Sequence, residues 1–391
     1  MISESILKNV HKYEIKSFLK RNSVEKIDSR LTSHRADDYK PYSKIIDEEI
    51  KVNKINRKLV NEFLCEHICY SKTNIYHIFD LTNFFCFNTI TEVQLNHFKS
   101  NNPKLLFNNL ITDVTLEEEF QLCSTEVEHE NDQINQISFL FYLGLVDTRA
   151  KGRTSFFSNV IIDVKQKLVF VKFNSNLLEN AKYDKLFLIN RLLTILTKND
   201  EFQPLSIGYE SFNEEKPQKM IFKMFSELSL EAEEILNKKI PLGTDEKIKS
   251  FLKDVKISQN EKDYIKQIKA VIYQDLSDNF QGNLFKNGWV FRFVFREKDY
   301  TRASSRTDDY SPIYGSKVYW NLKELIFKGK KMNDAGFKWV LPRNQSPILV
   351  KLESKNNGII IQYYNDKERN NQKFRKEKDN FVAQKIRKYL S

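Results

Sequence analysis

A run of alternating side chains from Trp289 to Arg296 is the feature that most constrains the fold. It spells Trp-Val-Phe-Arg-Phe-Val-Phe-Arg, so an aromatic ring recurs at every second position. Successive side chains of a strand point to opposite faces of a sheet. The alternation therefore predicts a strand whose aromatic face consists of Trp289, Phe291, Phe293 and Phe295. Burial of each ring contributes about 2–3 kcal/mol, which places that face in a core.

The opposite face of this strand carries Arg292 and Arg296, whose Cα atoms should lie about 13–14 Å apart. The next segment is predicted to be a polar loop that supplies hydroxyl, aromatic and cationic groups: Tyr300, Arg302, Ser304, Ser305, Arg306, Tyr310, Tyr314 and Lys317. Guanidinium groups beside hydroxyls and exposed rings suit phosphate and an unstacked base. The alternative is a solvated edge with Arg–Asp pairs, because the same loop contains Asp299, Asp308 and Asp309.

Arginine is concentrated toward the C-terminus. The net charge is +11, but abundant lysine, asparagine and isoleucine are what an AT-rich genome produces by codon bias. Of the 15 arginines, 8 lie from Arg292 onward, and none lies between Arg191 and Arg292. A clustered basic surface is the electrostatic signature of a nucleic-acid partner. The residues predicted to contact it are Arg292, Arg296, Arg302, Arg306, Lys317, Lys373, Arg375 and Lys376.

The hydrophobic patterns predict an α+β protein with three regions. Residues 1–132 are expected to form a mainly helical N-terminal domain, and residues 133–282 a mixed sheet with a helical connector. Within the second region, 160–162 and 168–173 are expected to form a hairpin that turns at 163–167. Residues 283–391 are expected to form a β-rich, arginine-enriched C-terminal domain that closes with a helix over 378–390.

Composition excludes several classes of protein. A chain of 391 residues with 40% hydrophobic and 13% aromatic residues is not wholly disordered. The longest apolar run, 137–146, is too short to span a membrane, and the charged N-terminus is unlike a signal peptide. Four cysteines without a regular framework indicate the reducing cytoplasm. No membrane partner is expected.

Three residues suggest a different, catalytic interpretation. Asp147 on one predicted strand, followed by Asp163 and Lys165 on the next, resembles the metal-dependent nucleases of the PD-(D/E)xK type. In such an arrangement two carboxylates hold the metal and the lysine positions or activates water, so Mg²⁺ or Mn²⁺ would be required. The plainer interpretation is turn chemistry, because Asp163 lies where the hairpin should turn.

Other chemistries have weaker support. Cys65, His67, Cys69, His77 and Cys86 contain metal-binding residue types, but Cys65 and Cys69 are four residues apart and no second cysteine pair follows. Packing of these cysteines in a core is the preferred interpretation, and no metal site is predicted. The sequence lacks a P-loop, a dinucleotide-binding Gly-x-Gly-x-x-Gly and a Gly-x-Ser-x-Gly elbow.

The sequence therefore predicts a cytoplasmic nucleic-acid-binding protein without its own catalytic site and without a cofactor. Its AT-rich character and the lack of a housekeeping motif suggest a role in a mobile element or in antiviral defence. Two alternatives stay open. One is a nuclease that uses Asp147, Asp163, Lys165 and Mg²⁺; the other is a protein-interaction subunit of a larger complex, whose aromatic residues form the contact surface.

Overall fold

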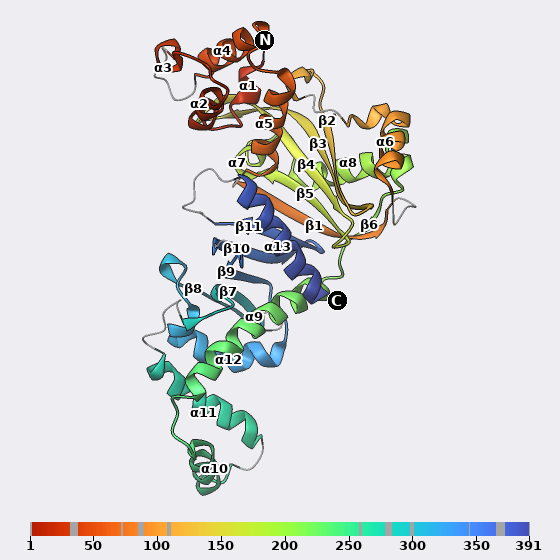
Figure 1. Cartoon of the computed structure of the whole chain (residues 1–391). Coiled ribbons are helices and arrows are strands. Elements are labelled where there is room, and N and C mark those ends of the chain that lie inside the picture. The colour runs from red at the N-terminus through yellow and green to blue at the C-terminus, as the bar shows by residue number, and fades with distance from the viewer. Residues whose placement is uncertain are drawn as a thin grey trace. The chain divides into compact units, whose positions relative to one another are not determined.

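The computed structural model describes residues 2–31, 38–71, 73–84, 90–107, 111–257, 260–277, 284–297, 301–343, 345–364 and 372–390. These residues form helices and antiparallel strands, so the α+β class is confirmed (Figure 1). The chain divides into two compact units. Unit 1 comprises Met1–Ser211 with Glu368–Ala383, and unit 2 comprises Phe212–Lys367 with Gln384–Ser391.

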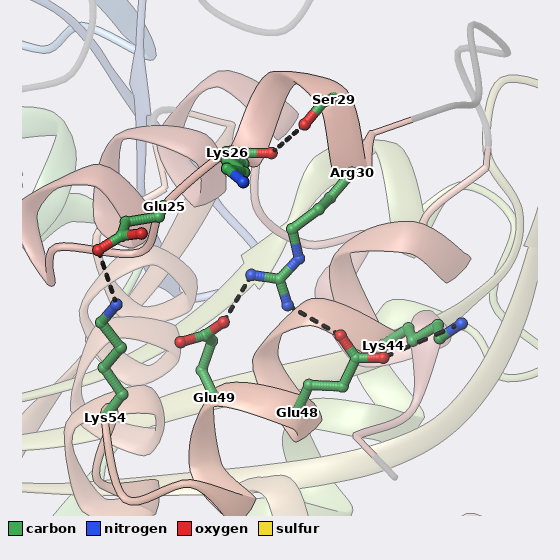
Figure 2. Close-up of polar contacts among 8 residues, drawn as sticks. All are labelled: Glu25, Lys26, Ser29, Arg30, Lys44, Glu48, Glu49 and Lys54. Atoms are coloured by element: carbon green, nitrogen blue, oxygen red, sulfur yellow. Dashed lines mark hydrogen bonds and ion pairs between the residues drawn. The ribbon is translucent and has the colours of Figure 1, made fainter.

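Unit 1 begins with a group of helices, as predicted: α1 (Glu4–Leu7), α2 (Lys12–Arg21), α3 (Ile27–Arg30), α4 (Lys40–Lys51) and α5 (Arg57–Cys69). His11 separates α1 from α2, because its side chain accepts the Tyr13 N–H and so caps the second helix. Figure 2 shows how Arg30 ties α3 to α4: its guanidinium lies 2.8 Å from Glu48 and 2.5 Å from Glu49. Apolar side chains of these helices pack together in one core.

The sheet of unit 1 has the strand order β2-β3-β4-β5-β1. Its strands are β1 (Asn74–Asn83), β2 (Gln121–Glu130), β3 (Gln133–Thr148), β4 (Gly152–Asp163) and β5 (Leu168–Asn174), and β6 (Gly208–Glu210) pairs with β1. The predicted hairpin is confirmed, since Asp163 pairs with Leu168 across the β4–β5 turn. Neighbouring residues of β3 face opposite cores: Phe139 and Phe141 pack with α8 (Lys185–Lys198), whereas Leu140 and Tyr142 pack with the N-terminal helices.

Short helical elements complete unit 1: α6 (Glu92–Asn101), η1 (Pro103–Leu105), η2 (Ile111–Asp113), α7 (Ser175–Leu178) and η3 (Asp200–Leu205). The C-terminal helix α13 (Gln372–Leu390) contributes residues to both units. In unit 1, Asp379 of this helix accepts the hydroxyl of Tyr76 and lies 3.0 Å from the ammonium of Lys172. Lys172 is only 2% exposed, so this ion pair is buried between helix and sheet.

The sheet of unit 2 has the strand order β11-β10-β9-β7-β8. Its strands are β7 (Trp289–Glu297), β8 (Thr301–Arg306), β9 (Asp334–Val340), β10 (Pro347–Lys355) and β11 (Gly358–Tyr363). One face is covered by α9 (Glu215–Asn237), which contacts β7, β9 and β10 (Figure 1). All four aromatic residues of the run are buried, as predicted. Two of them face these helices: Phe293 contacts Phe225 of α9, and Phe295 approaches Gly329 of α12 (Lys317–Gly329).

The remaining elements of unit 2 are α10 (Thr244–Asp254), α11 (Glu261–Leu276) and the short turns η5 (Asp308–Tyr310) and η6 (Ile313–Gly315). Helices α10 and α11 share a small cluster formed by Ile248, Leu252 and Ile265. Across the described part of the chain, no helix is both long and apolar enough to cross a bilayer.

The two units differ from the three predicted regions. The predicted boundary after residue 132 falls in the turn between β2 and β3, and the whole of β2 pairs with β3. The boundary after residue 282 separates α9 from β7 and β9, although these elements pack together. Pairing between distant segments defines the compact units, and a change of composition along the chain does not reveal it.

Candidate nucleic-acid interface

A β-bulge in β7 decides which side chains lie on the face of the unit 2 sheet opposite α9. Trp289 is opposite Lys338 and Val290 is opposite Phe337, but Arg292 is opposite Gly336, so Phe291 is an extra residue. Residues 336 and 338 of β9 point to the same face, because they are two positions apart. Trp289 therefore shares a face with Arg292, three residues away, which strict alternation would not allow.

Phe291 also lies on the arginine side of the sheet. A Cβ atom built on Gly336 would meet the Cγ of Arg292 at 2.4 Å and the Cζ of Phe291 at 2.6 Å. Both side chains thus occupy the space above Gly336. The four rings were predicted to share one face, but they do not. Phe293 faces α9 and Phe295 faces α12, while the bulge turns Trp289 and Phe291 to the other side.

The segment that follows β7 was predicted to be a loop, but part of it forms a strand. Thr301–Arg306 forms β8, which pairs with β7 so that Arg292 is opposite Arg306 and Arg296 is opposite Arg302. Directly opposed side chains of an antiparallel pair share a face, with Cβ atoms about 5 Å apart. The hairpin therefore presents two cross-strand pairs of arginines on one face, and the two pairs are separated by about 13 Å along the strand.

These four arginines differ in their surroundings. Arg296, Arg302 and Arg306 are exposed, and no ion pair joins any of them to a carboxylate whose side chain the structure describes. Arg292 is 20% exposed and lies 2.9 Å from Asp334. It also donates a hydrogen bond of 3.1 Å to the hydroxyl of Tyr364. Arg292 is thus part of the scaffold, whereas the other three are available to a ligand.

The same face continues over β9 and β10. Lys351 is opposite Gly336, and Glu353 is opposite Asp334. Lys351 lies 3.4 Å from Asp334 and 2.6 Å from Glu353. Burial raises the pKa of Asp334, although Arg292 and Lys351 counteract this effect. We call this surface the arginine face; its charged residues are Arg292, Arg296, Arg302, Arg306, Lys338, Lys351, Asp334 and Glu353. Basic groups outnumber acidic ones, so the surface attracts anions.

Three aromatic rings meet beside Arg306. Its guanidinium carbon lies over Tyr310 at 5.8 Å and over Tyr364 at 5.7 Å. The two tyrosine rings are 5.5 Å apart, and Phe291 contacts both of them edge-to-face. These distances are within the range of cation–π attraction. Arg306 is therefore held on an aromatic support while its outer side remains exposed.

The backbone that presents Tyr310 is strained. Asp309 and Tyr310 have φ angles of 52° and 55°, in the left-handed region that bulky side chains rarely adopt. Such a conformation costs on the order of 1–3 kcal/mol per residue and persists only where the surroundings impose it. Here the indole N–H of Trp289 donates to the Tyr310 carbonyl at 2.8 Å. Lys338 lies 4.5 Å over the Trp289 ring and helps to hold it. Trp289, which the bulge places on this face, thus connects β7 to the strained turn through its hydrogen bond to Tyr310.

Two of the predicted contact residues in the C-terminal helix lie in the other unit. Arg375 and Lys376 are part of unit 1, whereas the arginine face is part of unit 2. Arg375 is 7% exposed, and Lys376 forms an ion pair of 2.5 Å with Glu128. The side chain of Lys373 lies outside the described residues. Lys317 is exposed at the first turn of α12.

The structure separates the residues of the predicted nuclease site. Asp147 pairs with Arg153 beside the β3–β4 turn, whereas Asp163 pairs with Gln136 at the other end of the same hairpin. Asp147 lies eleven positions after Gln136, which corresponds to about 35 Å of strand. The two carboxylates cannot share a metal ion. Each lies near the C-terminal end of its strand, and the C-terminal ends of two paired antiparallel strands lie at opposite ends of the pair. The predicted nuclease geometry is therefore wrong.

Asp163 has a structural role in the turn. Its Oδ1 accepts the backbone N–H of Gln166 at 2.8 Å. Burial raises the pKa of this carboxyl group to about 6. Lys165 is exposed. These contacts agree with the plainer interpretation of Asp-x-Lys as turn chemistry.

The cysteine and histidine residues of α5 pack in the core, as predicted. Cys65 and Cys69 are buried with sulfur atoms 3.7 Å apart, and the hydrogen bond between the two thiols together with burial raises the pKa of Cys65. Nδ1 of His67 lies 2.8 Å from the Phe63 carbonyl. Within the described ranges, no three histidine, cysteine or carboxylate side chains are placed to hold a metal ion. Cys86 lies outside those ranges.

Sequence reasoning did not find Lys338, Lys351 and Tyr364 as members of the surface. The two lysines lie in strands where the other side chains are mostly apolar. A single lysine in such a strand does not by itself indicate a basic surface. Comparisons with models of protein families, with curated proteins and with solved structures found no match. The function is therefore argued from the geometry of the arginine face.

Proposed function

We propose that the protein binds nucleic acid through the arginine face and carries out no catalysis of its own. The observation that carries this proposal is the pair of cross-strand arginine couples, with Arg296, Arg302 and Arg306 exposed. Like charges directly opposite each other destabilise a sheet by up to about 1 kcal/mol per pair. A surface that keeps such pairs in register gains stability when a polyanion neutralises their exposed members, Arg296, Arg302 and Arg306.

The extent of the surface favours a polymer over a small anion. The two arginine pairs lie about 13 Å apart, which is farther than a single phosphate group can bridge. Arginine also forms bidentate hydrogen bonds with phosphate oxygens. A nucleic-acid strand can pass over both pairs, so that the exposed Arg306 of one pair and the exposed Arg296 and Arg302 of the other meet successive nucleotides, and the aromatic cluster beside Arg306 offers contacts to the bases.

A cytoplasmic location is part of the proposal and is supported by the cysteines. Cys65, Cys69 and Cys123 are free thiols, which suits a reducing compartment. A role in a mobile element or in antiviral defence remains a prediction from composition alone.

The proposal is tested by measuring binding of labelled single- and double-stranded DNA and RNA over a range of salt concentrations, with Mg²⁺ present. The test variant is Arg302→Ala with Arg306→Ala. The matched control is Arg149→Ala with Lys165→Ala, which removes the same charge from exposed positions of unit 1. On single strands, loss of two phosphate contacts should reduce the slope of log K against log salt by about 1.4.

Three results would contradict the proposal. The first is absence of binding to every probe at low salt. The second is an equal loss of affinity in the test and control variants, which would assign binding to net charge alone. The third is shortening of a probe in the presence of Mg²⁺ by purified protein, which would show that a catalytic site exists.

A further inference from the structure

The arrangement of Arg306 distinguishes it from the other arginines of the surface. Its guanidinium lies over two tyrosine rings at once, at 5.8 Å and 5.7 Å. Behind these rings, Phe291 contacts both edge-to-face, at 5.1 Å from Tyr310 and 5.6 Å from Tyr364. The phenol of Tyr364 is fixed by a hydrogen bond from Arg292. Every member of the cluster is thus positioned by another member, while Arg306 itself is exposed.

Arg302 is a natural contrast within the same strand. It is exposed, like Arg306, and it faces Arg296 across the hairpin. No aromatic ring among the described residues supports its guanidinium. Phosphate binding requires only the charge and the hydrogen-bond donors of such a residue. An aromatic support adds a defined orientation. It holds the planar guanidinium in one plane and leaves the outer face of that plane free to stack on another flat group.

The bases of nucleic acids are flat groups that stack on arginine planes and on aromatic rings. Within a duplex, the faces of the bases are covered by their neighbours, and only their edges are accessible. In a single strand the faces can be reached. A supported guanidinium beside a row of phosphate-binding arginines therefore matches a strand whose bases are not paired.

We propose, resting on the proposed function above, that the arginine face selects single-stranded nucleic acid and that one base stacks on Arg306 above Tyr310 and Tyr364. Arg296 and Arg302, which lie opposite each other about 13 Å farther along the hairpin, contact the phosphates of the neighbouring nucleotides on that side. Arg292 and Phe291 are positioning residues, since they hold the tyrosines and do not touch the ligand.

The test compares two variants that conserve charge, Arg306→Lys and Arg302→Lys. Each keeps a cation. Arg306→Lys removes a planar group that lies over two tyrosine rings, whereas none of the described aromatic rings lies over Arg302. Binding is measured to a single strand, to a strand of equal length and charge that lacks bases, and to a duplex, each as DNA and as RNA. Arg306→Lys should weaken binding to the single strand about tenfold relative to Arg302→Lys. The two variants should bind the strand without bases equally.

A second variant, Tyr310→Leu, removes the aromatic support and leaves Arg306 in place. It should weaken binding to the single strand and leave binding to the strand without bases unchanged. A strand that contains 2-aminopurine adds a direct measurement, because stacking quenches its fluorescence on binding to wild type and less so on binding to Arg306→Lys.

The outcomes separate this inference from the proposed function. If wild type binds duplex as tightly as single strand and both lysine variants bind alike, the stacking inference is wrong while nucleic-acid binding stands. If wild type prefers single strands but Arg306→Lys matches Arg302→Lys on them, stacking on Arg306 is likewise refuted. If the double alanine variant of Arg302 and Arg306 binds every probe like wild type, both proposals fail.

Discussion

Substitution of Gly336 by alanine tests the bulge that builds the arginine face. The added Cβ would lie 2.4 Å from the Cγ of Arg292, and 2.6 Å and 2.7 Å from two atoms of the Phe291 ring, distances that Cβ atoms essentially never show. The guanidinium stem and the ring must both move. Displacement of Arg292 weakens its 2.9 Å contact with Asp334, whose side chain is 9% exposed.

The expected loss of stability follows from these contacts. Overpacking costs about 1–3 kcal/mol, and separation of a fully buried ion pair costs about 3–5 kcal/mol; the second figure is reduced here because Arg292 is 20% exposed. Replacement of glycine recovers about 0.4–1 kcal/mol by restricting the unfolded chain. We expect unit 2 to lose about 3 kcal/mol in Gly336→Ala.

Tryptophan fluorescence during urea unfolding is the appropriate measurement. Trp289, Trp320 and Trp339 are the three tryptophans of the chain, and all belong to unit 2. The signal therefore reports this unit alone. Gly315→Ala is the matched control, because its Cβ would meet the Ser277 carbonyl oxygen at an ordinary 3.5 Å, and it should change stability by less than about 0.5 kcal/mol.

A double-mutant cycle tests whether the Phe291 ring is what the added Cβ of Gly336→Ala collides with. If its ring lies over Gly336, Phe291→Leu should relieve part of the clash. The combined loss of Gly336→Ala and Phe291→Leu should then be smaller than the sum of the single losses by more than about 0.5 kcal/mol. Equal stability of the Gly336→Ala and Gly315→Ala variants, or strict additivity in the cycle, would refute the bulge argument.

Two further predictions concern unit 1. Asp379→Ala should destabilise it by about 3–5 kcal/mol, because Lys172 is left buried without its carboxylate; hydrogen exchange in β1 and β5 measures this, and an effect below about 1 kcal/mol would contradict it. Asp163→Asn should stabilise unit 1 at pH 7, because burial raises the pKa of the folded carboxyl group from 3.8 to about 6 and the charged form is therefore penalised in the folded state. That penalty is absent below the unfolded pKa and grows as the pH rises toward the folded pKa, so the gain should approach about 3 kcal/mol at most at pH 7 and vanish near pH 4. The amide oxygen of asparagine can still accept the Gln166 N–H, and a gain that does not depend on pH would show that ionisation is not its cause.

Local sequence patterns were sufficient for most individual elements. Residues 3–22, in the region predicted to be mainly helical, form two helices, divided where His11 caps the second. The hairpin over 160–173 has the predicted turn, and the run from Trp289 to Arg296 is a strand. These features depend on the period of the side chains and on turn chemistry, which involve residues close together in the chain.

The candidate site was predictable only in part. The concentration of arginine pointed to the segment that forms the arginine face, and Arg296, Arg302 and Arg306 are exposed on it. The sequence contained no signal that Arg292 would pair with Asp334 or that Arg375 would be buried. Such differences depend on which strand or helix lies opposite each residue.

The sequence by itself determined that a strand forms at Trp289 and that arginine gathers in and after it. Only the tertiary structure decided which face each side chain occupies. A single extra residue in β7 turns Phe291 toward the arginines, because a slip of one position moves side chains to the other face of a sheet. The pairing of β7 with β8 aligns the arginines in couples, whereas the antiparallel pairing of β3 with β4 separates Asp147 from Asp163. Register is a property of two strands together, so neither strand's own sequence determines it.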